Sequence, residues 1–245
     1  MNLYHEILYR PLLNLLIWLY NVLPGADIGF AILMVTVLVK AALWPLTHAS
    51  LKANKAMQSI QPKIEALKVQ YKDDKEALTK AMMELYTTEK VNPLSSCLPI
   101  LVQLPLLIAL YQVLRAGLHA ESLNDLYSFV HKPETINAFF VGLIDLSKRS
   151  IPLAILAGGL QFLQTHMMMR KRVPPQVKKT EGAKDEEMLI AMNRSMLYVM
   201  PLMTVFIGWS IPGGLTLYWV AVNAITILQQ WIINTPKKPT VAKTV

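Results

Sequence analysis

The sequence predicts an all-α membrane protein, a five-transmembrane-helix bundle with an N-terminal interfacial amphipathic helix and a cytoplasmic helical hairpin. Of the 245 residues, 53% are hydrophobic and only 16% are charged, whereas a soluble domain usually has about 25% charged residues. The mean hydropathy is +0.37. The chain also lacks a polar stretch long enough to be a soluble domain, and five of its segments have the length and composition of a membrane span.

Residues 1–26 are predicted to form an amphipathic helix at the membrane interface. Polar residues and a proline interrupt the apolar ones: His5, Glu6, Arg10, Pro11 and Asn14. Four aromatic residues suit the interfacial depth at which such rings anchor. The segment lacks a basic region followed by a cleavage site, so we expect no cleavable signal peptide.

A spanning helix needs about 20 mostly apolar residues. The five segments of this kind are 28–46, 97–118, 151–169, 196–211 and 215–233. Only Pro212-Gly213-Gly214 separates the last two, so we expect them to form an antiparallel hairpin. Together the five segments define an expected core over residues 27–235.

The basic residues indicate the orientation of this core. Eighteen lysines and arginines fall on the side that holds the stretches between spans one and two, between spans three and four, and after span five, against five on the other side. By the positive-inside rule, the N-terminus is outside and the C-terminus is cytoplasmic. The excess of basic residues is thereby explained without sequence-specific nucleic-acid recognition. A flexible linker at 173–187 and a short basic tail at 236–245 complete the cytoplasmic side.

The cytoplasmic hairpin is predicted over residues 48–92. Apolar residues recur at helical spacing on both sides of an interruption at residues 71–74, where Asp73 or Asp74 is a fair N-cap for the second helix. A connection needs fewer residues than this. Two interpretations stay open, a solvated surface and a docking surface.

Lys40 lies inside the first predicted span, where a charged residue costs about 2.5–3.5 kcal/mol on insertion scales. It either extends its side chain to the interface or faces a wet cavity. Thr36 lies one turn before it, and the fifth span carries a polar stripe. No carboxylate lies inside any span to neutralise Lys40, which favours a water-filled groove of positive potential. The residues expected to line it are Lys40, Thr36, Gln103, Gln161, Gln164, Tyr218, Trp219 and Asn223.

No metal-ligand cluster, phosphate-binding loop or nucleophile with a base is present in the sequence, so we expect neither a cofactor nor an enzyme. A small-solute transporter or channel is the alternative, although the sequence lacks the internal repeat typical of that class. A purely structural or assembly role beside a larger translocase is a further alternative.

Four phrases of the sequence resemble the YidC/Oxa/Alb membrane protein insertases. They are FAILMVTVLVKAALWPLT at residues 30–47, IQPKIEAL, MMELYTTEKVNPLSSCLPILVQLPLLIALY, and IPGGLTLYWVAVNAITILQQ at residues 211–230. The resemblance runs in order from Asp27 to Ile233 and matches a short bacterial form without the large extracytoplasmic domain. Lys40 falls where the family usually has an arginine, Thr36 falls on a groove threonine, and Trp219 falls at a position of substrate contact.

The resemblance implies an insertase and chaperone that receives polar segments of nascent membrane proteins in a positively charged hydrophilic groove. The hydrophobic spans of these clients then leave sideways into the lipid bilayer. It implies a multi-pass protein of the cell (inner) membrane. The ribosome and a Sec translocon are candidate partners, although the tail carries only three lysines, so we expect weak ribosome binding through it.

Overall fold

The structure, a computed structural model, describes residues 3–23, 25, 27–72, 74–92, 98–117, 123, 125–169 and 184–234. These residues are mostly helical, which confirms the helical fold class. In chain order the elements are η1 (His5–Tyr9, a short π-helix), α1 (Arg10–Val22), α2 (Ile28–Ala42), α3 (Trp44–Gln70), α4 (Lys75–Thr88), α5 (Leu98–Gly117), β1 (Phe139–Phe140), β2 (Ile144–Asp145), α6 (Ile151–Met169), α7 (Lys184–Ser210) and α8 (Gly213–Asn234).

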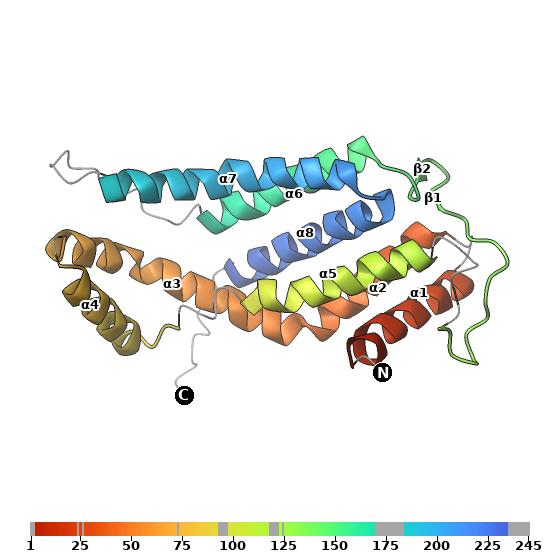
Figure 1. The fold of residues 1–245 in the computed structure, drawn as a ribbon, viewed down its shortest axis with the longest axis horizontal. Coiled ribbons are helices and arrows are strands. Elements are labelled where there is room, and N and C mark those ends of the chain that lie inside the picture. The colour runs from red at the N-terminus through yellow and green to blue at the C-terminus, as the bar shows by residue number, and fades with distance from the viewer. Residues whose placement is uncertain are drawn as a thin grey trace, which may run out of the picture.

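Helix α8 lies between two groups of helices. α6 and α7 pack against each other and against one side of α8, whereas α1, α2 and α5 form the second group, which contacts α8 through α2 and α5 (Figure 1). The hairpin of α3 and α4 extends from one end of the molecule, and the β1–β2 loop lies at the other end.

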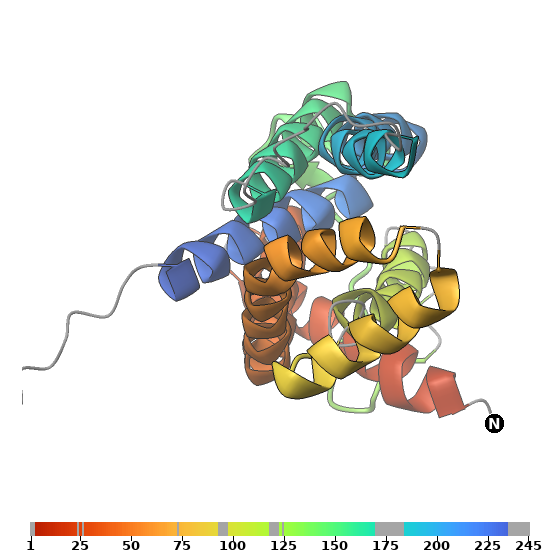
Figure 2. The same ribbon diagram turned by 90° about the vertical axis from the view of Figure 1, so that its left-hand side faces the viewer.

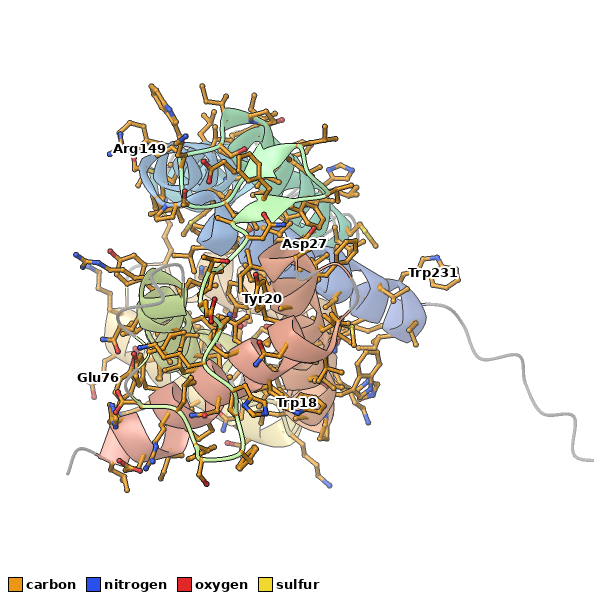
Figure 3. All side chains as sticks on the ribbon, turned by 90° about the vertical axis from the view of Figure 1, so that its right-hand side faces the viewer. Trp18, Tyr20, Asp27, Glu76, Arg149 and Trp231 are labelled. Carbon is orange, nitrogen blue, oxygen red and sulfur yellow. The ribbon has the colours of Figure 1, made fainter. Side chains whose placement is uncertain are left out.

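The N-terminal helix α1 buries one apolar face against α2 and α5. Leu13, Leu16 and Ile17 are completely buried, whereas Trp18 points outward from the opposite side and is 44% exposed (Figure 3). Apolar residues thus lie on both the buried and the exposed side of this helix, and its expected amphipathic character stays a prediction. Its position at a membrane interface stays a prediction.

The first predicted span ends earlier than expected. The sequence suggests one helix over residues 28–46, but α2 ends at Ala42, and α3 begins at Trp44 after a bend of 67°. Pro45 explains the break, because a proline has no N–H to donate to the carbonyl four residues earlier. As a result, Lys40 lies in the last turn of α2 and not near the middle of a span.

The predicted hairpin is present as α3 and α4, although α3 starts four residues before the expected boundary at 48. Of the two candidate N-caps, Asp74 performs this role for α4, since its Oδ1 accepts hydrogen bonds from the N–H groups of Glu76 (3.1 Å) and Ala77 (2.9 Å). Asp73 lies outside the described residues. An ion pair between Lys63 of α3 and Glu89, the residue after α4, joins the two arms.

The segment between α5 and α6 contains a small β-hairpin that the sequence reading did not predict. Phe139 pairs with Asp145 and Phe140 with Ile144. The two turn residues, Val141 and Gly142, have φ of 52° and 68°, as required by the tight turn that matches the twist of antiparallel strands. Among the described residues, the fold is thus all-α except for these two-residue strands.

Hydrogen bonds and buried side chains hold this loop against the neighbouring helices. The carboxylate of Asp27 accepts hydrogen bonds from Gly29 N (2.7 Å) and Phe30 N (3.3 Å) at the start of α2, and its second oxygen accepts one from Val141 N (2.7 Å). Asp27 and Tyr20 lie inward at this end of the bundle (Figure 3). Leu146 is fully buried under the start of α8. The loop therefore covers the end of the bundle opposite the hairpin.

Helix α6 matches the third predicted span, whereas α7 begins at Lys184, twelve residues before the fourth predicted span. The expected flexible linker at 173–187 lies mostly outside the described residues, and its last four residues are helical. α7 and α8 are antiparallel neighbours, as predicted, but only Ile211 and Pro212 separate them. The N–H groups of Gly213 and Gly214 donate to Lys148 O (2.8 Å) and Leu146 O (3.0 Å).

The number of membrane spans is a separate question from the number of helices. By length and apolar composition, one helix in the described part of the chain, Gly213–Ile233 within α8, is sufficient to cross a membrane, and α2 with α3 passes the same test as a bent pair. Leu197–Ser210 is a shorter apolar helix. The count of five spans is therefore not confirmed and stays a prediction.

Candidate functional site

Lys40 is a buried cation at the contact between α2 and α8. Its side chain is 7% exposed, and its Nζ donates a hydrogen bond to Thr226 Oγ1 at 3.3 Å. Among the described residues, no carboxylate forms an ion pair with it. A buried charge without a counter-charge is costly in an apolar environment. Lys40 is therefore a buried cation with a hydroxyl as its hydrogen-bond partner, and it lacks a counter-charge among the described residues.

Thr36, one turn before Lys40, is 1% exposed. Its hydroxyl donates to the carbonyl oxygen of Ile32 at 2.7 Å, within its own helix. The oxygen of this hydroxyl keeps a lone pair as an acceptor. On the same face of α2, Lys40 therefore has a hydrogen-bond donor and Thr36 an acceptor.

Helices α5 and α8 are joined by a hydrogen bond from Gln103 Nε2 to the Tyr218 hydroxyl. Tyr218 is 1% exposed, and Gln103 is half-buried. A buried tyrosine hydroxyl needs such a partner. Two of the predicted groove residues are thus brought together.

The polar residues predicted to form a stripe on α8 contact three neighbouring helices. Thr216 and Asn223 donate to carbonyl oxygens of α7 and α6, namely Gly208 O at 3.0 Å and Ala157 O at 3.2 Å, so both bind the bundle together. Thr226 accepts from Lys40 of α2. Trp219 is half-buried. Asn223 therefore contacts α6, whereas Thr226, one turn later on α8, contacts Lys40 of α2.

On α6, Gln161 and Gln164 are half-buried. The backbone carbonyl oxygen of Gln161 accepts a hydrogen bond from Thr165 Oγ1 at 2.9 Å. The side-chain oxygen of Gln164 is buried and has no hydrogen-bond partner among the described residues. The buried side-chain oxygen of Gln164 is thus available to a hydrogen-bond donor.

Gln229 is a polar residue that the sequence reading left out of the site. It is 1% exposed and donates through Nε2 to Thr47 Oγ1 at 3.2 Å, joining α8 to α3. The available signal was a second amide directly before Gln230, near the end of α8. Within the described residues, no group of three or more histidine, cysteine or acidic side chains is arranged to hold a metal ion.

This combination of a buried lysine, interhelical amides and a helical hairpin can be compared with known proteins. The family described as 60Kd inner membrane protein matches residues 18–240. The chain belongs to this family, which is the YidC/Oxa family of membrane insertases. The resemblance seen in the sequence is thereby confirmed.

Several curated proteins of the YidC family are similar to this chain. The membrane protein insertase YidC of Fusobacterium nucleatum is 36% identical over 228 residues, which cover 92% of this chain and 96% of that protein. The YidC proteins of Geobacter sulfurreducens and Neisseria meningitidis are 35% and 37% identical, and the matches cover 93% and 91% of this chain. The chain spans only 37% and 35% of the length of these two relatives.

A solved YidC structure has the same fold. It is a crystal structure of an active YidC insertase with its first transmembrane domain resolved. The similarity covers 97% of this chain and 48% of that one, with a TM-score of 0.60 and 24% sequence identity. This likeness supports the YidC-type arrangement of the helices.

Proposed function

We propose that this protein inserts and chaperones membrane proteins, with nascent membrane proteins as its substrates. A polar segment of the client binds in a hydrophilic groove beside Lys40, and the apolar spans then move sideways into the lipid. We further propose that the predicted spans cross the membrane with the N-terminus outside and the hairpin of α3 and α4 in the cytoplasm. The ribosome and a Sec translocon are partners that this orientation allows.

The observation that carries the proposal is that Lys40 is buried and forms no ion pair with a carboxylate in the part of the chain that the structure describes. The family membership gives the class of activity, and the position of Lys40 gives a mechanism. Moving an acidic tail through hydrocarbon is expensive, and a fixed cation lowers that cost. At an effective dielectric constant near 20, a carboxylate about 8 Å from the amine gains about 2 kcal/mol. This gain needs no nucleotide and no covalent chemistry, since the apolar spans partition into lipid by their own hydrophobicity.

The test is insertion of a single-span client into proteoliposomes that contain the purified protein. Lys40→Met removes the charge at similar length, and Lys40→Arg keeps it. For a client with an acidic tail, we expect insertion to slow by a factor on the order of 30 in Lys40→Met, which corresponds to about 2 kcal/mol, and to stay near the wild-type rate in Lys40→Arg.

A client with a neutral tail of equal length is the control, because it gains nothing from the cation. Equal insertion of the acidic-tailed client by wild-type protein and Lys40→Met contradicts the proposed role of the charge. Equal slowing of both clients indicates instead that Lys40 only supports the fold.

A further inference from the structure

A second polar region lies between the hairpin and the bundle, apart from Lys40. Figure 2 views the molecule from the hairpin end, where α3 passes close to α8 beneath α6. A pocket opens between these three helices. It is lined by Leu51, Asn54, Lys55 and Gln58 of α3, Met167 and Met168 of α6, and Gln230 and Ile233 of α8.

A buried side-chain amide without a hydrogen-bond partner lines this pocket. Gln230 is 4% exposed, and neither atom of its side-chain amide has a hydrogen-bond partner. Within the described part of the chain, four buried side-chain polar atoms have no partner, and all four belong to Gln164, Gln229 and Gln230. Gln164 lies one helical turn before Met168, which lines the pocket. Buried polar groups are nearly always paired in folded proteins, so the unpaired amide of Gln230 points to a ligand in the pocket.

The unpaired atoms of Gln230 indicate which chemical class of ligand fits the pocket. In the pocket, Gln230 leaves one carbonyl oxygen, which needs an N–H or O–H donor, and one amide nitrogen, which needs an acceptor. A phosphate or a carboxylate supplies acceptors only. An extended peptide supplies both groups, because its backbone N–H and C=O are not paired with each other as they are in a helix.

The position of the pocket relates it to the client path. Gln230 lies one turn after Thr226, the partner of Lys40, on the same face of α8. The distance between these two positions along the helix axis is about 6 Å. A chain that approaches from the hairpin end therefore meets the pocket before it meets Lys40.

We infer that the pocket between α3, α6 and α8 binds an extended segment of the client through its backbone, as a first subsite on the way to Lys40. The inference rests on the proposed insertase function. Gln230 supplies a donor and an acceptor to the segment, and the thioethers of Met167 and Met168 contact its side chains. The specificity is for unfolded backbone and not for a particular sequence.

The first test uses clients that differ in backbone N–H groups. One carries four consecutive alanines in its polar tail, and the other carries four prolines, which have no N–H to donate. In proteoliposomes, Gln230→Met is expected to slow insertion of the alanine client about two- to tenfold, as for the loss of one or two neutral hydrogen bonds, with little effect on the proline client. Gln70→Met, the same change at an exposed residue at the end of α3, is the matched control and is expected to leave both rates unchanged.

The second test is independent of insertion. A photoreactive amino acid at Met167, with an exposed position on the same helix, Ile155, as the control, is irradiated in vesicles that hold an arrested nascent chain. We expect crosslinks to the chain from position 167 and far fewer from position 155.

The outcomes separate the two proposals. Crosslinks from position 167 to lipid alone identify a phospholipid head group as the occupant and overturn the inference. Equal slowing of both clients by Gln230→Met, or no slowing of either, overturns it as well, because the glutamine then supports the fold or binds only water. If wild-type protein inserts neither client but still crosslinks to the arrested chain, the insertase proposal fails while the pocket inference stands.

Discussion

The most specific prediction about the fold concerns Asp27, because its carboxylate binds both the start of α2 and the β1–β2 turn, which are distant in the sequence. One of its oxygens caps α2 through Gly29 N and Phe30 N, and the other accepts from Val141 N at 2.7 Å in the β-hairpin turn. The side chain is only 8% exposed, so water does not easily replace these bonds. Asp27→Asn leaves one oxygen for two tasks. Whichever way the amide turns, either the cap or the turn loses its acceptor.

The magnitude follows from the bond that is lost. Asparagine caps helices about as well as aspartate, so we expect the amide oxygen to stay on the cap and its NH₂ group to face Val141 N. A hydrogen bond to a charged group contributes about 1.5–3 kcal/mol. Local opening of the β1–β2 turn is therefore expected to become about 10 to 100 times more frequent.

Hydrogen exchange measured by mass spectrometry reports this opening directly. In Asp27→Asn, peptides that contain residues 139–146 are expected to exchange faster by that factor, while peptides at the start of α2 change little. Asp74→Asn is the matched control, because Asp74 caps α4 but binds no third N–H in the described residues. Unchanged exchange at residues 139–146 in Asp27→Asn refutes the coupling between the turn and α2.

Two further predictions concern the packing of α6 and the pH dependence of the β1–β2 hairpin, which follows from the pKa of Asp145. A Cβ added to Gly158 would lie 2.3 Å from Val205 Cγ2 and 3.0 Å from Pro201 O, whereas a Cβ added to Gly159 would meet nothing within 4 Å. Gly158→Ala is therefore expected to destabilise the protein by about 1–3 kcal/mol through overpacking, and Gly159→Ala is expected to be tolerated. Thermal unfolding of both variants in detergent measures the difference. A hydrogen bond from Ser147 and the nearby Lys148 amine hold the pKa of Asp145 below its ordinary value of 3.8. The stabilisation of the hairpin by Asp145 is thus complete above that pH and is lost as the pH falls through the lowered pKa; hydrogen exchange of residues 139–146 measured across acidic pH checks this, and Asp145→Asn removes the dependence.

Much of the helical framework could be predicted from apolar segments alone. α6 has the predicted bounds, and α5 and α8 agree within about two residues, because long apolar runs with few interruptions give a strong signal. The break at Leu43 was missed although Pro45 was visible, since the apolar composition continues through it. The early start of α7 at Lys184 was missed because charged residues at 184–187 and 194 flank a short apolar run, which is too short to indicate a span. The β-hairpin depends on two residues with positive φ, one of which is a valine that rarely adopts this conformation.

The candidate site could be predicted only in part. Sequence spacing identified Lys40 and the polar face of α8, because unpaired polar residues are conspicuous in apolar helices. It did not reveal which neighbour each residue faces. Asn223 binds the Ala157 carbonyl, and Thr226, one turn away on the same stripe, binds Lys40. Only the packing of α2 and α6 on different sides of α8 separates these two roles.

The bend at Leu43 has a mechanical consequence. No loop separates α2 from α3, so the hairpin is a lever arm whose pivot lies three residues from Lys40. The 27 residues of α3 give this arm a length of about 40 Å at 1.5 Å per residue. A rotation of about 10° at the pivot therefore displaces the far end of α3 by about 7 Å. A force applied to the hairpin by a bound molecule is thus shared between the last turn of α2, which carries the buried amine, and the contact of α3 with α8 at Thr47 and Gln229.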